Sequence, residues 1–241
     1  MTLLALALAP AIAIIFFVIA KDKYNKEPFK NLFVSFLMGI LSTVPAIILQ
    51  LLLKGRLENY FESASVVYYA FFAFGAVGFS EEFSKFFMLR YYAYRQPAFD
   101  EPLDGIIYGV MVSMGFATLE NIMYVTQYGF GTAIVRMFLS VPAHACFGVI
   151  MGYYIGLAKF DKARSGHFMR MGLLLAIFFH GSFDFFLFLE QNKMVTQYVS
   201  AGILSLGAII SLYIAIRVSL RSIHLHQELS RIEYERKNNF W

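Results

Sequence analysis

Charged residues and cysteines are scarce in this 241-residue chain. Asp, Glu, Lys and Arg together make up 15% of the residues, whereas about 25% is usual for a soluble domain. With 59% hydrophobic residues and a mean hydropathy of +0.62, the composition excludes a soluble globular domain and indicates an integral membrane protein. The single cysteine, Cys146, excludes an intrachain disulfide, so cysteine usage does not identify the redox compartment.

The sequence also lacks a large net charge, a zinc-protease motif and long connecting segments. The net charge of +4 is small and dispersed, which argues against a nucleic-acid partner and leaves membrane lipids as the expected surroundings. The HExxH spacing is absent, so no local motif supports a metal site. Connecting segments are short and leave no room for a second folded domain. We therefore expect one transmembrane domain over 1–220, with its motif-bearing core at 66–190.

Seven stretches are long and apolar enough to cross a membrane, since a spanning helix needs about 20 apolar residues. They lie near 2–20, 31–53, 66–94, 105–127, 133–158, 170–190 and 197–220. Fifteen of the 20 Lys and Arg residues fall in the loops and tail on one side, which the positive-inside rule makes cytoplasmic. The sequence predicts an all-α, polytopic membrane helix bundle of about seven helices, with its N-terminus outside and its C-terminus cytoplasmic.

The tail at 221–241 has a different character from the spans. Leu225, Leu229 and Ile232 would share one face of a helix among charged residues. This pattern is typical of an amphipathic helix at a membrane surface, here on the cytoplasmic side.

Ionisable residues inside the predicted spans are the main functional signal, because the membrane makes each of them costly. Successive spans carry Glu81, Glu82 and Lys85; Glu120 and Asn121; Arg136 and His144; and His180 and Asp184. Glu82, Glu120, His144 and Asp184 each lie 13 to 15 residues from the nearest cytoplasmic boundary, or roughly 20 to 22 Å at 1.5 Å per residue. In a hydrocarbon core about 30 Å thick, they would meet at one level in the outer half.

The types of these residues suit hydrolysis of a peptide bond. Two adjacent carboxylates in a low-dielectric site repel each other, so one can act as a general base while the other keeps a proton. Lys85 would steady the ionised one, and His180, four residues before Asp184, could be oriented by it to donate to an oxyanion or leaving amine. Imidazoles and carboxylates also suit zinc, with a metal-bound water as nucleophile. The cofactor is therefore one zinc ion or none, and the candidate ligands are His144, His180, Glu82 and Glu120.

The same residues resemble the motifs of the PrsW-type intramembrane proteases. EEFSK at 81–85 resembles the family's EExxK, FATLEN at 116–121 resembles its FxxxEN, and His144 and the His180–Asp184 pair resemble the other two. DEPLDGIIYG at 100–109 also resembles the family's approach to the fourth helix. The pattern is more distantly similar to the type II CAAX prenyl endopeptidase and bacteriocin-immunity superfamily, from which it departs by having Glu120 in place of a histidine.

The resemblance implies an intramembrane endopeptidase of a bacterial cytoplasmic membrane. Such an enzyme makes the first (site-1) cut in a single-pass, membrane-anchored anti-sigma factor, on the outer side, in stress signalling. On this interpretation Glu81 or Glu82 activates the water, with Glu82 slightly preferred, and Glu120 and His144 complete the water or metal site. His180, held by Asp184, stabilises the oxyanion.

Three residues are candidates for contact with the substrate: Asn121, Lys85 and Arg136. Asn121 would position the substrate backbone. Arg136 would guide an acidic substrate segment or, alternatively, reach the membrane surface as an interfacial arginine.

Two non-proteolytic functions use the same residue types. Intramembrane acids and histidines form proton or ion pathways in transporters, although the cytoplasmic halves of these spans are nearly all apolar. A peptide receptor or immunity protein would bind without cutting, and its function would survive Glu82→Gln.

Overall fold

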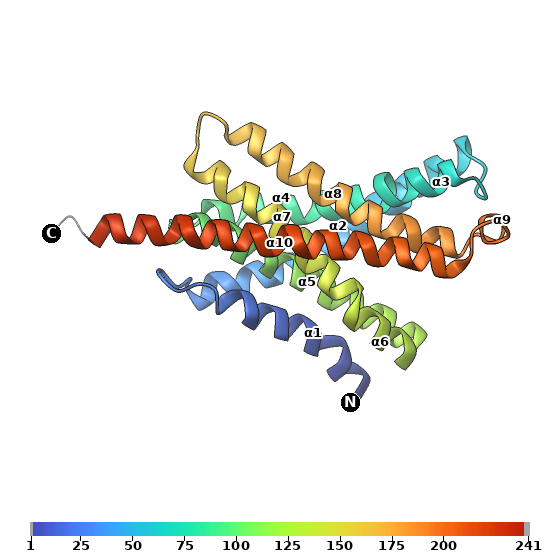
Figure 1. Ribbon diagram of the computed structural model, residues 1–241, viewed down its shortest axis with the longest axis horizontal. Coiled ribbons are helices and arrows are strands. Elements are labelled where there is room, and N and C mark those ends of the chain that lie inside the picture. The colour runs from blue at the N-terminus through green and yellow to red at the C-terminus, as the bar shows by residue number, and fades with distance from the viewer. Residues whose placement is uncertain (1, 239–241) are drawn as a thin grey trace.

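The computed structural model describes residues 2–238, and every regular element in that range is a helix (Figure 1). The helices are α1 (Thr2–Ile19), α2 (Phe29–Tyr60), α3 (Val66–Phe71), η1 (Phe72–Phe79), α4 (Ser80–Tyr91), η2 (Ala93–Arg95), α5 (Pro102–Tyr128), α6 (Phe130–Phe138), α7 (Ser140–Phe160), α8 (Ser165–Glu190), α9 (Lys193–Thr196) and α10 (Ala201–Asn238). The predicted all-α membrane bundle is confirmed.

Six helical segments in the described range are long and apolar enough to cross a membrane. They are Thr2–Ile19, Phe29–Tyr60, Pro102–Tyr128, Phe130–Phe160, Ser165–Glu190 and Ala201–Arg236. The predicted third span, 66–94, corresponds to α3, η1 and α4, which follow one another without a gap and include a π-helical stretch, and then to η2; no one of these elements is long enough to cross alone. The count of seven and the direction of the termini stay predictions.

The centre of the bundle is α5, which packs against α7, α2 and α1. All of its first 17 residues are buried, and small residues allow the close approach. A Cβ atom built on Gly105 would lie 2.4 Å from the carbonyl oxygen of Gly152 on α7. The two backbones therefore touch, which places the site residues of α5 and α7 next to each other.

A π-helical stretch, η1, directly precedes Glu81 and Glu82. A Cβ on Gly78 of η1 would lie 3.3 Å from the backbone nitrogen of Gly181 on α8, and a Cβ on Gly181 would lie 2.4 Å from the Phe74 ring. Because both residues lack a side chain, η1 lies directly against α8. This approach brings the two glutamates to the histidine of α8.

The predicted tail continues α10 without a break, so no loop separates it from the last span (Figure 1). Ser222, His226 and Ser230 face the bundle and are buried, whereas Leu225, Leu229 and Ile232 are 40 to 54% exposed. The tail is helical as predicted through Asn238, and 239–241 lie outside the described residues. The position of its apolar face at a membrane surface stays a prediction.

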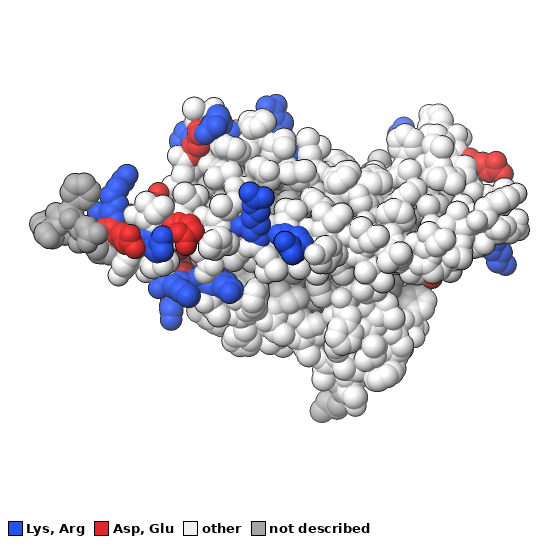
Figure 2. Space-filling view, in the orientation of Figure 1, with Lys and Arg blue, Asp and Glu red and all other residues white. Residues whose placement is uncertain are grey.

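Lysines and arginines gather at one end of the molecule, around the C-terminal half of α10 and the connection between α7 and α8 (Figures 1 and 2). The surface between the two ends is almost free of charge in this view (Figure 2). We call the lysine- and arginine-rich end the basic end. It is the end that the positive-inside rule assigns to the cytoplasm.

Candidate active site

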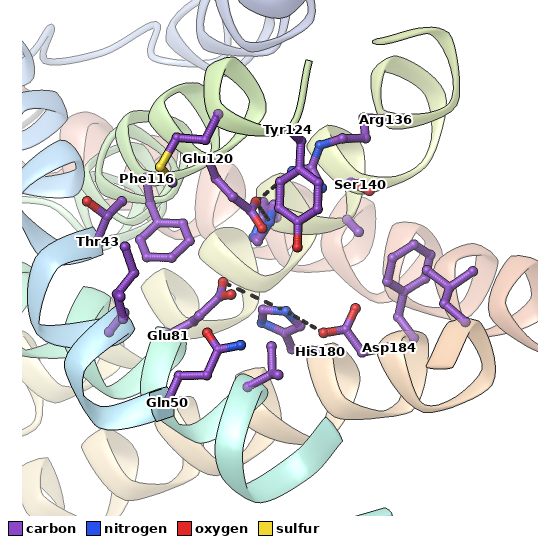
Figure 3. Close-up of a pocket in the computed structure, with 18 of the residues that line it drawn as sticks. Thr43, Gln50, Glu81, Phe116, Glu120, Tyr124, Arg136, Ser140, His180 and Asp184 are labelled. Atoms are coloured by element: carbon purple, nitrogen blue, oxygen red, sulfur yellow. Dashed lines mark hydrogen bonds and ion pairs between the residues drawn. The ribbon is translucent and has the colours of Figure 1, made fainter. Parts of the chain in front are cut away.

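A cavity of about 720 Å³ lies among α2, η1, α4, α5, α6, α7 and α8 (Figure 3). Its lining includes six residues that the sequence singles out, namely Glu81, Glu120, Arg136, His144, His180 and Asp184. Most of the remaining wall is apolar or aromatic, including Ile47, Leu51, Phe72, Phe116 and Phe183. Polar groups therefore converge in an otherwise apolar chamber, which is the usual character of a ligand site.

On one side of the cavity, His180 connects three carboxylates. Its Nδ1 lies 2.7 Å from Glu82 Oε1, and its Nε2 lies 3.2 Å from Asp184 Oδ2 and 3.9 Å from Glu81 Oε2. Glu82 is fully buried, while Glu81 and Asp184 line the cavity (Figure 3). The predicted His180–Asp184 contact is present, and Glu82 fixes the other nitrogen of the ring.

On the other side, Glu120 is held by two partners. Its Oε2 lies 2.8 Å from His144 Nε2 and accepts a 2.7 Å hydrogen bond from the Arg136 guanidinium. Arg136 Nε donates to Asn121 Oδ1 at 2.9 Å, and Asn121 Nδ2 donates to the backbone oxygen of Ala7 on α1 at 2.8 Å. This network fixes Glu120 and ties the site to the first helix.

Arg136 bonds to Glu120 and to Asn121, and Arg136, unlike Asn121, lines the cavity. Asn121 is fully buried, and its amide bonds to Arg136 and Ala7. Arg136 lines the cavity with 11% of its side chain exposed, and its guanidinium lies 4.3 Å from the centre of the Tyr124 ring. Substrate contact by either residue stays a prediction.

Lys85 joins the two sides of the site. Its ammonium donates to Glu82 Oε1 at 2.8 Å and lies 3.4 Å from Glu81 Oε2 and 3.1 Å from His144 Nδ1. Only 2% of the side chain is exposed. A buried carboxylate needs such a partner, since an unpaired charge in this environment would be very costly.

Four side chains form a group that could hold a metal ion: Glu81, Glu82, His144 and His180. Each offers one ligand atom, and these atoms lie within 4.8 Å of one another. Glu82 Oε2 is buried without a hydrogen-bond partner among the described residues, so it is free to bind a cation. Two imidazoles and two carboxylates are a donor set that zinc accepts. The group contains three of the predicted ligands, with Glu81 in place of Glu120.

Gln50 was not singled out from the sequence. Its side chain points into the cavity near Glu81 and makes no hydrogen bond within the described range (Figure 3). The sequence could have indicated it, because Gln50 is the only polar residue in the apolar run 44–53. An unpaired amide at this place can bond to a ligand backbone.

Comparison with known proteins identifies the family. The family model described as PrsW family intramembrane metalloprotease matches residues 27–216. The chain is 40% identical over 192 residues to Protease PrsW of Bacillus subtilis, covering 79% of this chain and 84% of that protein. Protease PrsW of Geobacillus kaustophilus is 37% identical over 191 residues, covering 79% and 82%.

A third relative gives the same result. Protease PrsW of Shouchella clausii is 40% identical over 186 residues, covering 77% of this chain and 83% of that protein. No solved structure gives a significant match. The matched range includes every motif residue from Glu81 to Asp184, so this chain belongs to the PrsW family of intramembrane proteases.

Proposed function

We propose that the protein is an endopeptidase that hydrolyses a peptide bond of a membrane-anchored protein inside this cavity. The observation that carries the proposal is the meeting of Glu81, Glu82, Lys85, His144 and His180 beside a chamber enclosed by apolar helices. Family membership supports a protease, and two carboxylates held by cationic or hydrogen-bonding partners suit water activation.

Glu81 is the better placed of the two glutamates to act as the base. It lines the cavity, whereas Glu82 is fully buried between Lys85 and His180. Glu81 takes a proton from water as the water oxygen attacks the peptide carbonyl carbon. The carbonyl oxygen then carries the negative charge. When the C–N bond breaks, Glu81 returns the proton to the leaving amine, so the carboxylate is regenerated.

His180 is in position to stabilise the oxyanion. Its Nε2 lies between two cavity-lining carboxylates, Glu81 and Asp184. The 3.2 Å contact with Asp184 orients the ring, and Glu82 holds the opposite nitrogen. With Nδ1 engaged by Glu82, the Nε2–H would be shared between Asp184 and the oxyanion. The ring is already oriented before the substrate arrives, which is the basis of preorganised charge stabilisation.

Glu81, Glu82, His144 and His180 would hold the metal that the family description implies. A zinc ion bound there supplies a Lewis acid and lowers the cost of ionising water. The Lys85 ammonium contacts three of these four residues. A divalent cation held there would compete with the Lys85 ammonium for the negative charge of the two glutamates, although Lys85 uses Glu82 Oε1 and leaves Oε2 free.

The substrate we propose is a single-pass membrane protein, with an anti-sigma factor as the candidate and a first cut near the outer side. Support for the outer side comes from the charge distribution and from the depth of Glu82, Glu120, His144 and Asp184 along their helices. Support for a membrane-embedded substrate comes from the apolar cavity wall.

Cleavage by purified protein in liposomes tests the proposal. The wild-type protein should cut a co-reconstituted membrane-anchored candidate, and mass spectrometry of the products should map the bond to the outer part of its span. Glu81→Gln and Glu82→Gln should each reduce cleavage at least about 100-fold, while Glu58→Gln, an exposed residue outside the cavity, should not. Undiminished cleavage by both variants would refute the mechanism, and no cleavage of any candidate would favour transport or binding instead.

A further inference from the structure

A cluster of cations at the basic end plays no part in the proposed hydrolysis. Arg90 Cζ lies 4.4 Å from the centre of the Tyr94 ring, Lys159 Nζ lies 5.1 Å from it and Lys162 Nζ lies 5.5 Å from it. These residues come from the last turns of α4 and α7 and from the connection between α7 and α8. We call these four residues the Tyr94 cluster.

No carboxylate forms a direct ion pair with any of the three cations of the cluster in the described residues. The nearby Asp161 is bound by Arg164 at 2.6 Å, and Asp104 is fully buried and accepts from the backbone N–H groups of Asp100 and Glu101. Three like charges around one ring repel each other, so this arrangement favours an anion.

The cluster also has hydrogen-bond donors to spare. Lys159 Nζ uses two of its three, to the backbone oxygens of Tyr94 at 2.6 Å and Gln96 at 3.4 Å. The guanidinium of Arg90 and the ammonium of Lys162 donate to no group in the described range. An oxyanion with several acceptor oxygens could receive these bonds at once.

Uncharged hydrogen-bond donors at the start of α8 lie next to the Tyr94 cluster. Ser165 Oγ lies 3.4 Å from the Tyr94 hydroxyl and belongs to the first residue of α8, a helix of 26 residues. The first N–H groups of a helix lack intrahelical partners and carry partial positive charge. The end of α8 therefore adds to the positive potential around Tyr94.

Topology and helix dipoles explain why basic residues occur at this end, but not why three of them converge. Unconstrained lysine and arginine side chains would spread apart in water, which lowers their repulsion. Here Lys159 is anchored by two carbonyl groups and Arg90 stacks on Tyr94. The convergence is built into the fold.

We propose that Arg90, Lys159 and Lys162 bind the phosphate group of an anionic phospholipid. Exposed aromatic side chains on the helix that carries Arg90 support a lipid: Phe83, Phe87 and Tyr91 lie at four-residue spacing on α4 and are 37 to 57% exposed. Phosphate would meet the cations while acyl chains contact these rings. Basic pockets between helices are a known type of headgroup site.

Native mass spectrometry of the detergent-purified full chain tests this inference. The wild-type protein should bind dioleoyl phosphatidylglycerol at least about tenfold more tightly than dioleoyl phosphatidylcholine at low salt. Arg90→Gln with Lys162→Gln should lose this preference, and Arg90→Lys with Lys162→Arg should keep most of it. The matched control is Lys23→Gln with Lys30→Gln, which removes the same charge from exposed positions on the same end.

Each outcome has a definite meaning. If the control lost the preference for phosphatidylglycerol to the same extent, the preference would come from diffuse surface charge, and the proposed site would be overturned. An unchanged preference in Arg90→Gln with Lys162→Gln would overturn it as well. Displacement of the lipid by millimolar inorganic phosphate, with the same dependence on Arg90 and Lys162, would support the phosphate site but assign it to a soluble ion. Thermal unfolding of each variant in phosphatidylcholine checks that it is folded.

Discussion

Lys85 is the residue on which the electrostatic balance of the site depends, because it contacts both glutamates and His144. Its positive charge and a divalent cation held by Glu81, Glu82, His144 and His180 would compete for the charge of the same two carboxylates. We therefore expect removal of the ammonium to favour a metal.

Lys85→Met should strengthen zinc binding. The substitution leaves two buried carboxylates without their cation, so the variant should be less stable than wild type by about 3 to 5 kcal/mol without metal. Added zinc should raise its melting temperature more than that of the wild-type protein. Adding His144→Ala and His180→Ala should abolish the difference, and a weaker zinc response in Lys85→Met would contradict the competition.

Arg136 bonds to both Glu120 and Asn121, so we expect it to act by positioning Glu120. Arg136→Lys should lower kcat about 10- to 100-fold with little change in KM, since an ammonium lacks the planar fork with which the guanidinium bonds to Asn121 through Nε and to Glu120 through Nη2. Kinetics with one membrane-anchored substrate provide the measurement. Arg56→Lys, on an exposed part of α2, is the control, and a rise in KM alone would instead support direct substrate contact.

At the scale of the elements, the contact between η1 and α8 decides whether Glu82 reaches His180. Gly181 makes that contact possible, because its missing side chain leaves room for the Phe74 ring. A π-helical turn next to functional residues is a recurrent feature of helices, and here it directly precedes the two glutamates.

Gly181→Ala should separate η1 from α8. The new Cβ would meet the Phe74 ring at 2.4 Å, so the unfolding free energy should fall by about 1 to 3 kcal/mol and cleavage should drop sharply. Gly166→Ala on the same helix is the matched control, since its Cβ would meet nothing within 4 Å. Equal effects of the two substitutions on cleavage would contradict the role of this contact.

The connection between α1 and α2 docks onto α5 through Glu27, which lies outside the spans. Burial raises the pKa of this carboxyl from 4.5 to about 7, and Tyr108 of α5 donates a hydrogen bond to it. The folded state therefore binds the proton more tightly than the unfolded state. Stability from this group is present below about pH 4.5 and is lost as the pH rises towards 7.

Glu27→Gln should remove part of the pH dependence of stability. The variant should unfold at a higher temperature than wild type at pH 8, where the wild-type carboxylate is ionised, with little difference at pH 4.5. Thermal unfolding in detergent at the two pH values measures this, with Glu62→Gln as an exposed control at the other end. A wild-type advantage at pH 8 would show that the ionised carboxylate is stabilising.

At the scale of the whole molecule, charge separates the two ends of the bundle (Figure 2). The positive-inside rule then orients the protein, and the orientation sets the side on which the substrate would be cut. The direction of the chain in the membrane is thus a functional prediction as well as a topological one.

Thiol labelling in intact cells should give this direction. Cys146 is the single cysteine and is buried, so Cys146→Ser gives a suitable background for new cysteines. A membrane-impermeant reagent should label Lys193→Cys from outside and Lys23→Cys only after permeabilisation. The reverse pattern would place the N-terminus in the cytoplasm.

Much of the architecture could be predicted because the bilayer imposes strong local rules. Apolar runs of about 20 residues become helices, since no other open structure satisfies the backbone there, and rare ionisable residues inside them mark function. For this reason the sequence alone predicted the helix positions and the set of polar residues from Glu81 to Asp184. It did not predict the π-helical stretch η1 within the third span, because η1 packs against α8, which is distant in sequence.

The sequence by itself determined the membrane class, the family motifs and the set of polar residues that had to find partners. Only the tertiary structure decided the partners that come from other segments of the chain: His144 beside Lys85, Arg136 on Glu120, Gln50 at the cavity and two lysines beside Tyr94. The physical reason is distance. Charge and hydrophobicity are properties of single residues and their neighbours in sequence, whereas a hydrogen bond or ion pair depends on side chains from different helices meeting within about 3 Å.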